Sequence, residues 1–325
     1  MKHCFIINPA SGKETTKDGL ESRIKEGCAA RGAECFVYFT TGRGDAQRYI
    51  DEFCREHRDE DVRFYACGGD GTLCEVVNGV MALENRERVS VGVIPVGTGN
   101  DFVRNFSPKE SFFDIDAQVC ADAVDIDVIE CNGFYAINMI NIGFDSQVVV
   151  NTDKIKKKRW VPSKLAYICG LIVTLIKKPG VSIGISADGD DEQKKELLLT
   201  TFANGCFCGG GFNSNPHAQL CDGKINAMFV NDVTRLKFIS LVSEYKNGTH
   251  LDGRFENILG ETKKERFSLT FDKPTQMSVD GELVDTGARV DISCKKRALR
   301  FLVPKGTVCA ALGKSSARDT EAVLA

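Results

Sequence analysis

The sequence predicts a doubly wound α/β domain with a mostly parallel sheet, followed by a β-sandwich domain. Three observations lead to this prediction. Apolar strand-like runs alternate with helix-like segments from residue 1 to about residue 120. After that point, short strand-like runs separated by turns replace the alternation. The length of 325 residues fits about two domains of roughly 150 residues each.

In the N-terminal half, continuous apolar runs predict buried parallel strands, and one-sided apolar patterns predict helices. The run "VRFYACG" at 62–68 is a strand of this kind, and "TLCEVVNGV" after it places apolar residues on one helical face. Such alternation is typical of a doubly wound sheet. The predicted strands are 2–7, 34–39, 62–67 and 91–96, and the predicted helices are 16–31, 44–57, 72–84 and 100–106.

In the C-terminal half, strand-like runs bounded by turn residues predict a sandwich. We expect one helical insertion at 161–178 and a second helix at 234–247. The expected domains are 1–125 and 126–312, and the last residues, 313–325, are expected to form a flexible tail. The predicted strands lie in "VDIDVIEC", "GFYAINMINIGF", "VSIGISADG", "ELLLTTFANG", "KINAMFVND", "RFSLTFD", "TQMSVDGELV" and "RVDISC".

Composition narrows the class of protein. Hydrophobic residues make up 42% and charged residues 27% of the chain, which is ordinary for a soluble globular protein. A formal net charge of −3 argues against a general nucleic-acid binder. The 14 cysteines are scattered without CxxC pairs, so we expect small buried hydrophobes in a reducing cytosol. The longest apolar run, 165–176, is too short to span a bilayer.

The stretch "GGDGT" at 68–72 lies on a predicted strand-to-helix turn. Glycines allow the backbone to approach a bulky anion, and a helix N-terminus attracts phosphate. Asp70 repels bare phosphate but suits phosphate carried with Mg²⁺, which prefers carboxylate and water oxygens. A glycine-rich turn with a helix-capping Asp is an equally weighted alternative, because short glycine motifs are common.

Three more predicted strands end in similar turns. "PVGTGNDF" contributes Asp101, "NPASGK" contributes Asn8, and "TTGRGDA" follows Thr40. The carboxyl ends of parallel strands share one edge of a sheet, so these turns should meet there. Four such turns together indicate a nucleotide site.

Taken together, these motifs resemble the diacylglycerol kinase catalytic-domain family, in its bacterial YegS-like lipid kinase branch. Further matching pieces are "NIGFDSQV", "LAY", "GGGFNSNPHAQLCDG" and "SVDGE", and all occur in the family's order from residue 5 to about residue 285. GGDG alone is shared with NAD kinases and phosphofructokinases, whereas "PVGTGNDF" with a downstream "DGE" is much more specific. Cys74 and Cys221 depart from the usual Asn and Asp, which affects the expected affinity more than the assignment.

The resemblance implies an ATP- and Mg²⁺-dependent lipid kinase with its active site between the two domains. Asp70 would hold the catalytic Mg²⁺, joined by Asp101 and by an aspartate of the first strand of the second domain. Counting back from "YAIN" favours Asp127 for that position, with Asp125 as the alternative. The predicted nucleotide-binding residues are Asn8, Thr40, Gly68, Gly69, Asp70, Gly71, Thr72, Glu75, Thr98 and Asn100.

The segment "SVDGELV" supplies the proposed base. Alone, DGE favours a simple β-turn, but the family uses the Glu of this triplet as the base that accepts the lipid hydroxyl proton. Glu282 is therefore the predicted catalytic base, and Asp280 is predicted to orient the site.

The loop "PHAQLCDGKIN" raises a separate metal question. By resemblance it would hold a structural Mg²⁺ through Asp222 and the backbone carbonyls of Gln219 and Lys224. A turn Asp that caps its own backbone is a comparably weighted alternative, since Cys221 replaces the usual second acid. His217 is expected to be an exposed loop residue.

A lipid kinase must reach a membrane surface. The basic segment 154–160 is a candidate for peripheral docking on anionic lipid, equally weighted with a solvated loop before a buried helix. The default acceptor is diacylglycerol, the expected location is the cytoplasm, and a homodimer is one alternative for the oligomeric state. The competing functions are an NAD kinase-like enzyme and a catalytically silent lipid- or nucleotide-binding regulator.

Overall fold

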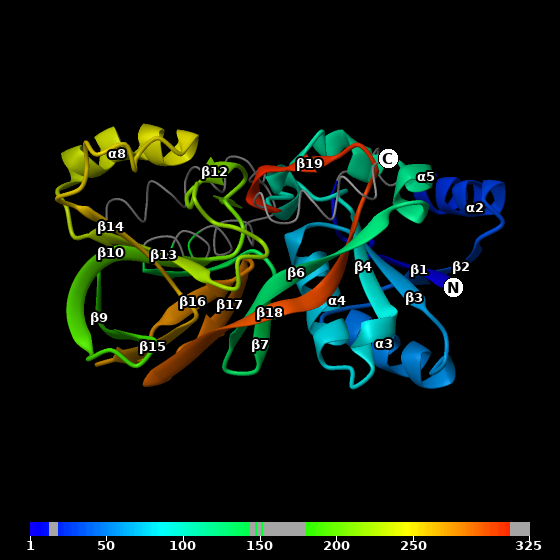
Figure 1. Ribbon diagram of the computed structural model, residues 1–325, viewed down its shortest axis with the longest axis horizontal. Coiled ribbons are helices and arrows are strands. Elements are labelled where there is room, and N and C mark those ends of the chain that lie inside the picture. Colours follow the sequence, from blue (N-terminus) through cyan, green and yellow to red (C-terminus); the bar gives the residue numbers. More distant parts are fainter. Residues whose placement is uncertain (13–18, 144–146, 148–150, 152–179, 313–325) are drawn as a thin grey trace.

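The chain folds into two lobes that lie side by side (Figure 1). The computed structural model describes residues 1–12, 19–143, 147, 151 and 180–312. The N-terminal lobe is built on four parallel strands in the order β4-β3-β1-β2. Three of them match the prediction residue for residue, and the fourth lies two residues earlier than expected. Their bounds are Lys2–Ile7 (β1), Glu34–Phe39 (β2), Val62–Cys67 (β3) and Val89–Ile94 (β4).

Helices cover this sheet, and most of them confirm the predicted alternation. The predicted helix at 100–106 is wrong: the chain forms only a 3-10 turn at Phe102–Asn105 and then a short strand, β5 (Phe106–Ser107). The turn before this segment is held by a contact from a distant part of the chain. Asn100 adopts a left-handed conformation (φ 52°), and its backbone N–H donates to Asp70. The helices are α2 (Leu20–Ala30), α3 (Asp45–Glu56), α4 (Asp70–Met81) and α5 (Ile115–Val119).

The second lobe is the expected β-sandwich, and its eight predicted strand segments all contain strands. β10 is central, since different parts of it pair antiparallel with β8, β9 and β13. The predicted helix at 234–247 is α8 (Arg235–Asn247). The main strands are β6 (Asp122–Cys131), β7 (Phe134–Ala136), β8 (Met139–Gly143), β9 (Val181–Ala187), β10 (Gln193–Ala203), β13 (Ile225–Asn231), β14 (Leu259–Lys264), β15 (Arg266–Phe271), β16 (Gln276–Val279), β17 (Glu282–Asp285) and β18 (Arg289–Val303).

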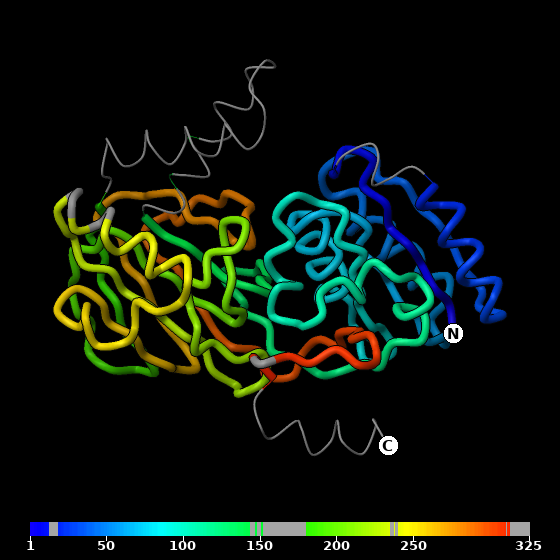
Figure 2. The backbone as a smooth tube through the Cα atoms, turned by 90° about the horizontal axis from the view of Figure 1, so that it is seen from above, coloured from blue at the N-terminus to red at the C-terminus, as the bar shows by residue number. Residues whose placement is uncertain are grey.

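Two long strands connect the lobes (Figure 1). β18 pairs with β15 in the sandwich and, further along, with β4 of the parallel sheet. β6 runs antiparallel to β18 with a register shift between Lys295 and Leu299. Backbone hydrogen bonds therefore continue from one lobe to the other, and Figure 2 shows the two lobes from above with this connection between them. The predicted domain boundary at 125/126 falls inside β6.

The structure tests the predictions for the cysteines, and part of those for membrane contact. All cysteines in the described part of the chain are free, and five of them are fully buried, whereas Cys120 is exposed. No helix among the described residues is long and apolar enough to cross a membrane. The helix predicted at 161–178, the basic segment 154–160 and the tail 313–325 lie outside the described residues.

An aromatic cluster stabilises the place where β18 meets the N-terminal lobe. Phe301 of β18 is completely buried, and its ring centroid lies 5.0 Å from that of Phe102 and 5.9 Å from that of Phe106. Phe112 lies 6.3 Å from it on another side. Edge-to-face and offset aromatic contacts of this kind add to the energy of apolar burial.

Replacing Phe301 by alanine should therefore lower the free energy of unfolding by about 3–5 kcal/mol, because it leaves a cavity between the lobes. Urea unfolding measures the change. The matched control is Phe134→Ala, since Phe134 is 47% exposed on β7 and its truncation should cost less than about 1 kcal/mol. Equal losses in the two variants would contradict the importance of this cluster.

Candidate active site

The strand-end turns of the parallel sheet meet at its carboxyl edge, as predicted. The backbone N–H of Asn8 donates to Cys67, and the Asn8 amide donates to the Thr72 hydroxyl at 3.1 Å. The turn after β2 reaches α4, because the Gly44 N–H donates to the Glu75 carboxylate at 3.1 Å. Four turns from different strands thus form one surface.

Two of these turns approach so closely that only glycine fits. A Cβ atom on Gly97 would collide with the backbone of Gly69, and one on Gly68 would collide with the Thr72 side chain. Gly12 has φ 71°, and a Cβ there would overlap the carbonyl oxygen of Val96. The glycines are therefore required for turn-to-turn packing, in addition to any role in binding an anion.

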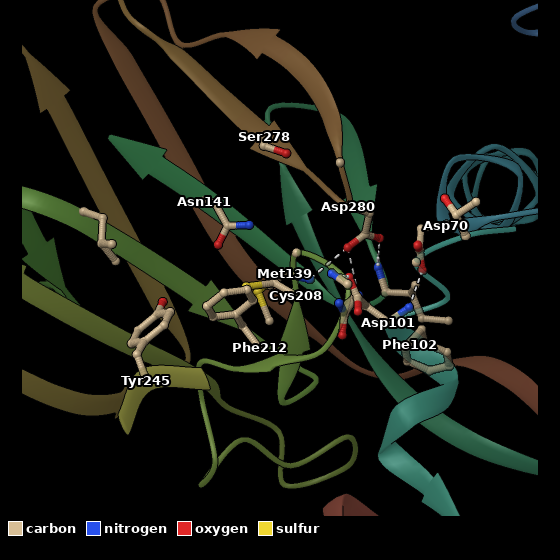
Figure 3. Close-up of a pocket in the computed structure, with 18 of the residues that line it drawn as sticks. Asp70, Asp101, Phe102, Met139, Asn141, Cys208, Phe212, Tyr245, Ser278 and Asp280 are labelled. Carbon is tan, nitrogen blue, oxygen red and sulfur yellow. Dashed lines mark hydrogen bonds between the residues drawn. The ribbon is translucent and has the colours of Figure 1, made fainter. Parts of the chain in front are cut away.

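Asp70 is the first residue of α4, and its carboxylate holds the neighbouring "GTGND" turn. It accepts the backbone N–H of Asn100 at 2.9 Å and that of Asp101 at 2.8 Å. Asp101 in turn accepts the N–H of Gly210 from the second lobe at 2.8 Å and lies 3.2 Å from Arg104. Figure 3 shows Asp70 and Asp101 next to each other at one end of a pocket.

Asp280 approaches the same place from the sandwich (Figure 3). Its carboxylate accepts three backbone N–H groups, from Ile137 at 2.7 Å, Asn138 at 3.1 Å and Met139 at 2.8 Å. Asp280 has φ 48° and begins the Asp-Gly turn that precedes Glu282. These three hydrogen bonds fix the Asp280 side chain against residues 137–139, and its predicted role in orienting the site stays a prediction.

Glu282 lies where the two lobes face each other. Its carboxylate is 3.1 Å from the Arg43 guanidinium, and a Cβ atom added to Gly71 would lie 3.1 Å from its Oε1. The predicted base is thus next to the predicted phosphate-binding turn. Arg43 is not among the predicted site residues, although it lies within the "TTGRGDA" motif, because its contact depends on a residue 239 positions further along the chain.

The buried acids disfavour negative charge. Desolvation raises the pKa of Asp280 to about 7, despite its three N–H donors, and the nearby charge of Asp70 adds to this shift. Desolvation and the charge of Asp70 raise the pKa of Asp101 to about 6, and desolvation also raises the pKa of Asp70. A cation placed among these groups would offset both the desolvation of the carboxylates and the repulsion between them.

A cavity of about 280 Å³ opens beside these acids and extends into the sandwich. Its walls are mostly apolar and come from β8, β10, β13, β16 and α8. Thr98 and Gly99 of the "GTGND" turn line the same cavity, so the acids stand between the turns and the apolar space. Its apolar lining includes Leu73, Phe102, Ile137, Met139, Leu199, Phe212, Val230, Leu241, Val242 and Tyr245.

The other predicted nucleotide-binding residues have internal partners. Thr40 is buried, with its backbone N–H on the Ile7 carbonyl. The Asn100 amide donates to the carbonyl oxygens of Pro95 at 2.6 Å and Gly97 at 2.9 Å, so it shapes its own turn. Among the described residues predicted to bind the nucleotide, Thr98 and Asp70 line the cavity.

The structure does not bring Asp127 to Asp70 and Asp101. Its two carboxylate oxygens accept the backbone N–H groups of Gly223 at 2.6 Å and Arg297 at 2.7 Å. Its side chain therefore contacts the loop before β13 and the backbone of β18. Asp125, the alternative, is exposed and lines a polar groove along β18.

The loop predicted to hold a structural metal has the contacts of the alternative, in which Asp222 caps the backbone of its own turn. Asp222 forms an ion pair with Lys263 at 3.0 Å and accepts the backbone N–H of Lys224 at 3.0 Å. The carbonyl of Gln219 remains an untested ligand. His217 is exposed as expected, and it pairs with Glu261 at 2.9 Å.

Models of two protein domains match this chain, one for each lobe. Residues 2–131 match the model of the diacylglycerol kinase catalytic domain, and residues 138–303 match that of the YegS C-terminal NAD kinase beta sandwich-like domain. A diacylglycerol kinase of Bacillus subtilis is 32% identical over 295 residues, covering 87% of this chain and 90% of the relative.

Among solved structures, a crystal structure titled as a diacylglycerol kinase from Bacillus anthracis aligns with a TM-score of 0.70 at 21% identity. The alignment covers 94% of this chain and 98% of that chain. At this identity the similarity supports the fold.

The raised pKa of Asp280 predicts a pH-dependent stability. Between its unfolded value near 3.8 and its folded value of about 7, the folded protein binds more protons than the unfolded chain. Without added divalent cations, the free energy of unfolding should therefore fall by roughly 1–4 kcal/mol as the pH rises from 4 to 7. Urea unfolding at several pH values measures this slope.

The Asp280→Asn variant should show a flatter slope, because the amide does not titrate. Asp285→Asn, an exposed change on the neighbouring strand, serves as the control and should keep the wild-type slope. An unchanged slope in Asp280→Asn would assign the pH dependence to other groups.

Proposed function

The chain belongs to the diacylglycerol kinase family and is a lipid kinase, and from this premise we propose that it transfers the γ-phosphate of ATP, with Mg²⁺, to the hydroxyl of a lipid alcohol. The default acceptor is diacylglycerol, and the product is then phosphatidic acid. One observation carries the proposal: three carboxylates line the apolar cavity where it meets the glycine-rich turn surface, Asp101 and Asp280 buried and Asp70 partly buried.

The turn surface suits a nucleotide triphosphate. Gly68, Gly69, Gly71 and Thr72 precede or begin α4, so backbone N–H groups and the helix N-terminus favour phosphate there. Asn8 supports Thr72, and Glu75 holds the Gly44 turn. Thr40, Thr98 and Asn100 complete the proposed nucleotide side of the site.

The same acids fit a magnesium ion. Each Asp70 oxygen accepts one backbone N–H and retains a lone pair, and the raised pKa values indicate a cluster that a cation would stabilise. Mg²⁺ usually keeps several waters and takes one or two carboxylates together with phosphates. Asp70 and Asp101 would hold the ion, which would neutralise charge on the phosphates.

Glu282 is the proposed base. Its position opposite Gly71 places it beside the phosphate surface, where it can accept a proton from a lipid hydroxyl. The ion pair with Arg43 holds its side chain across the gap between the lobes. The apolar cavity behind Asp280 would receive the acyl end of the lipid, with the enzyme bound peripherally to the membrane during turnover.

Wild-type enzyme should transfer labelled phosphate from ATP to diacylglycerol in mixed micelles with Mg²⁺. The Asp70→Asn variant should lose at least about 100-fold in kcat, because it weakens charge neutralisation while keeping most of the turn contacts. A panel of lipid alcohols, together with NAD as acceptor, identifies the substrate. Labelling of NAD alone, or of nothing while ATP still binds, would replace this proposal with an NAD kinase or a regulator.

The Glu282→Gln variant should bind ATP normally and lose about 100- to 10,000-fold in phosphate transfer, since the amide cannot accept the proton. Calorimetry measures ATP binding, and the micelle assay measures transfer. Glu265→Gln is the matched control, because Glu265 pairs with Lys296 on the surface of the sandwich. Wild-type turnover in Glu282→Gln would exclude it as the base.

A further inference from the structure

The apolar cavity contains a polar pair away from the acid cluster. Asn141 lies on β8 and Ser278 on β16, and both line the cavity. The two residues are direct partners in the antiparallel ladder between these strands. Figure 3 shows Asn141 on the opposite side of Met139 from Asp101, with Phe212 and Tyr245 beside the cavity below it.

Neither side chain is satisfied within the described part of the protein. Asn141 is 9% and Ser278 1% exposed, and Asn141 Oδ1 and Ser278 Oγ are buried without a hydrogen-bond partner there. Asn138 Oδ1 also has no partner there, but the Asn138 amide N–H donates to the Phe207 carbonyl at 2.7 Å, so that amide is already held by the protein. Buried polar atoms without partners are costly and rare. The Ser278 hydroxyl can satisfy Asn141 Oδ1, which leaves the Asn141 amide N–H groups, without a hydrogen bond in the described part of the chain, as donors for a ligand in the cavity.

Their place in the strands gives their distance from the reacting groups. Ser278 precedes Asp280 by two residues, and Asn141 follows Met139, whose N–H donates to Asp280, by two residues. Two residues along a strand correspond to about 7 Å. The polar pair therefore lies deeper in the cavity than the acid cluster, at a distance that spans a few bonds of a bound lipid.

We propose that Asn141, supported by Ser278, binds the carbonyl oxygen of the acyl linkage nearest to the hydroxyl that is phosphorylated. The Asn141 amide has two N–H donors, and a carbonyl oxygen is the polar group that a diacyl lipid carries at this distance. Ser278 is a positioning residue. Directly opposite residues have Cβ atoms about 4.5–5.5 Å apart, so its hydroxyl can turn to donate to Asn141 Oδ1 and fix the amide.

This inference rests on the proposed function and narrows its substrate class to lipids with an ester or amide carbonyl close to the acceptor hydroxyl. A cavity of about 280 Å³ is at the lower end of the range of small-molecule sites. It can hold the backbone of a glycerolipid and the first part of its chains. Recognition at the first linkage is therefore the selectivity that this cavity can provide.

The test compares 1,2-dioctanoyl-sn-glycerol with its dialkyl ether analogue, which has the same chain length and acceptor hydroxyl but no carbonyl groups. Wild type should prefer the diacyl lipid by about fivefold to tenfold in kcat/KM, the usual worth of one neutral hydrogen bond. Asn141→Leu should bring this ratio close to one, and Ser278→Ala should give an intermediate ratio.

Val230→Ala is the matched control, because Val230 lines the same cavity without a polar group. It should change both rates by the same factor and keep the wild-type ratio. Circular dichroism confirms that each variant is folded, and Ser278→Ala, a small change, keeps the test valid if Asn141→Leu is unstable.

Each other outcome overturns the inference. A wild-type ratio near one, or a wild-type ratio in both Asn141→Leu and Ser278→Ala, would show that the pair does not recognise a carbonyl. If wild type phosphorylates neither lipid but does phosphorylate a carbonyl-free alcohol, the proposed function stands and the inference fails. If it phosphorylates no lipid at all, the proposed function fails first.

Discussion

The hydrogen bonds of the Asp70 carboxylate are the interaction on which the site depends. Through the backbone N–H groups of Asn100 and Asp101 they join the N-terminus of α4 to the turn after β4. Asp101 extends the link to Gly210 in the sandwich. One partly buried carboxylate thus positions two turns and indirectly the second lobe. Its acid side chain in a glycine-rich turn is a structural requirement as well as a proposed metal ligand.

The strands of both lobes could be predicted because local sequence decides them. A parallel strand buried on both faces needs a continuous apolar run, and β1, β3 and β4 have mostly buried apolar runs, whereas β2 has an apolar run that is half-buried at the sheet edge. The error at 100–106 has the opposite origin. The pattern there is compatible with a helix, but Asn100 adopts a left-handed conformation (φ 52°) in a turn whose N–H is held by Asp70, 30 residues earlier in the chain. Contacts between distant segments override the local preference.

The sequence predicts which motifs contribute to the candidate site, but it does not predict which of their side chains contact one another. The turns, Asp280 and Glu282 lie together, as the resemblance implies, because each motif occupies a strand end or a turn. The predicted place of Asp127 in the metal network stays a prediction. Its carboxylate accepts the N–H groups of Gly223 and Arg297, and the sequence indicates its strand but not the direction of its side chain. The pair of Asn141 and Ser278 depends on the register of β8 against β16. Register between segments this far apart is not visible in composition or spacing.

The way the lobes are joined bears on catalysis. On one side, β6 and β18 carry backbone hydrogen bonds from the sandwich into the parallel sheet. On the other side, individual contacts cross the gap, such as Asp101 with Gly210 and Arg43 with Glu282. Phosphoryl transfer depends mainly on positioning and charge neutralisation. A continuous sheet fixes the nucleotide turns relative to the acceptor cavity, whereas the exposed ion pair at Glu282 can be exchanged when substrates bind. The protein therefore combines a rigid frame with one adjustable contact, at the residue proposed to move the proton.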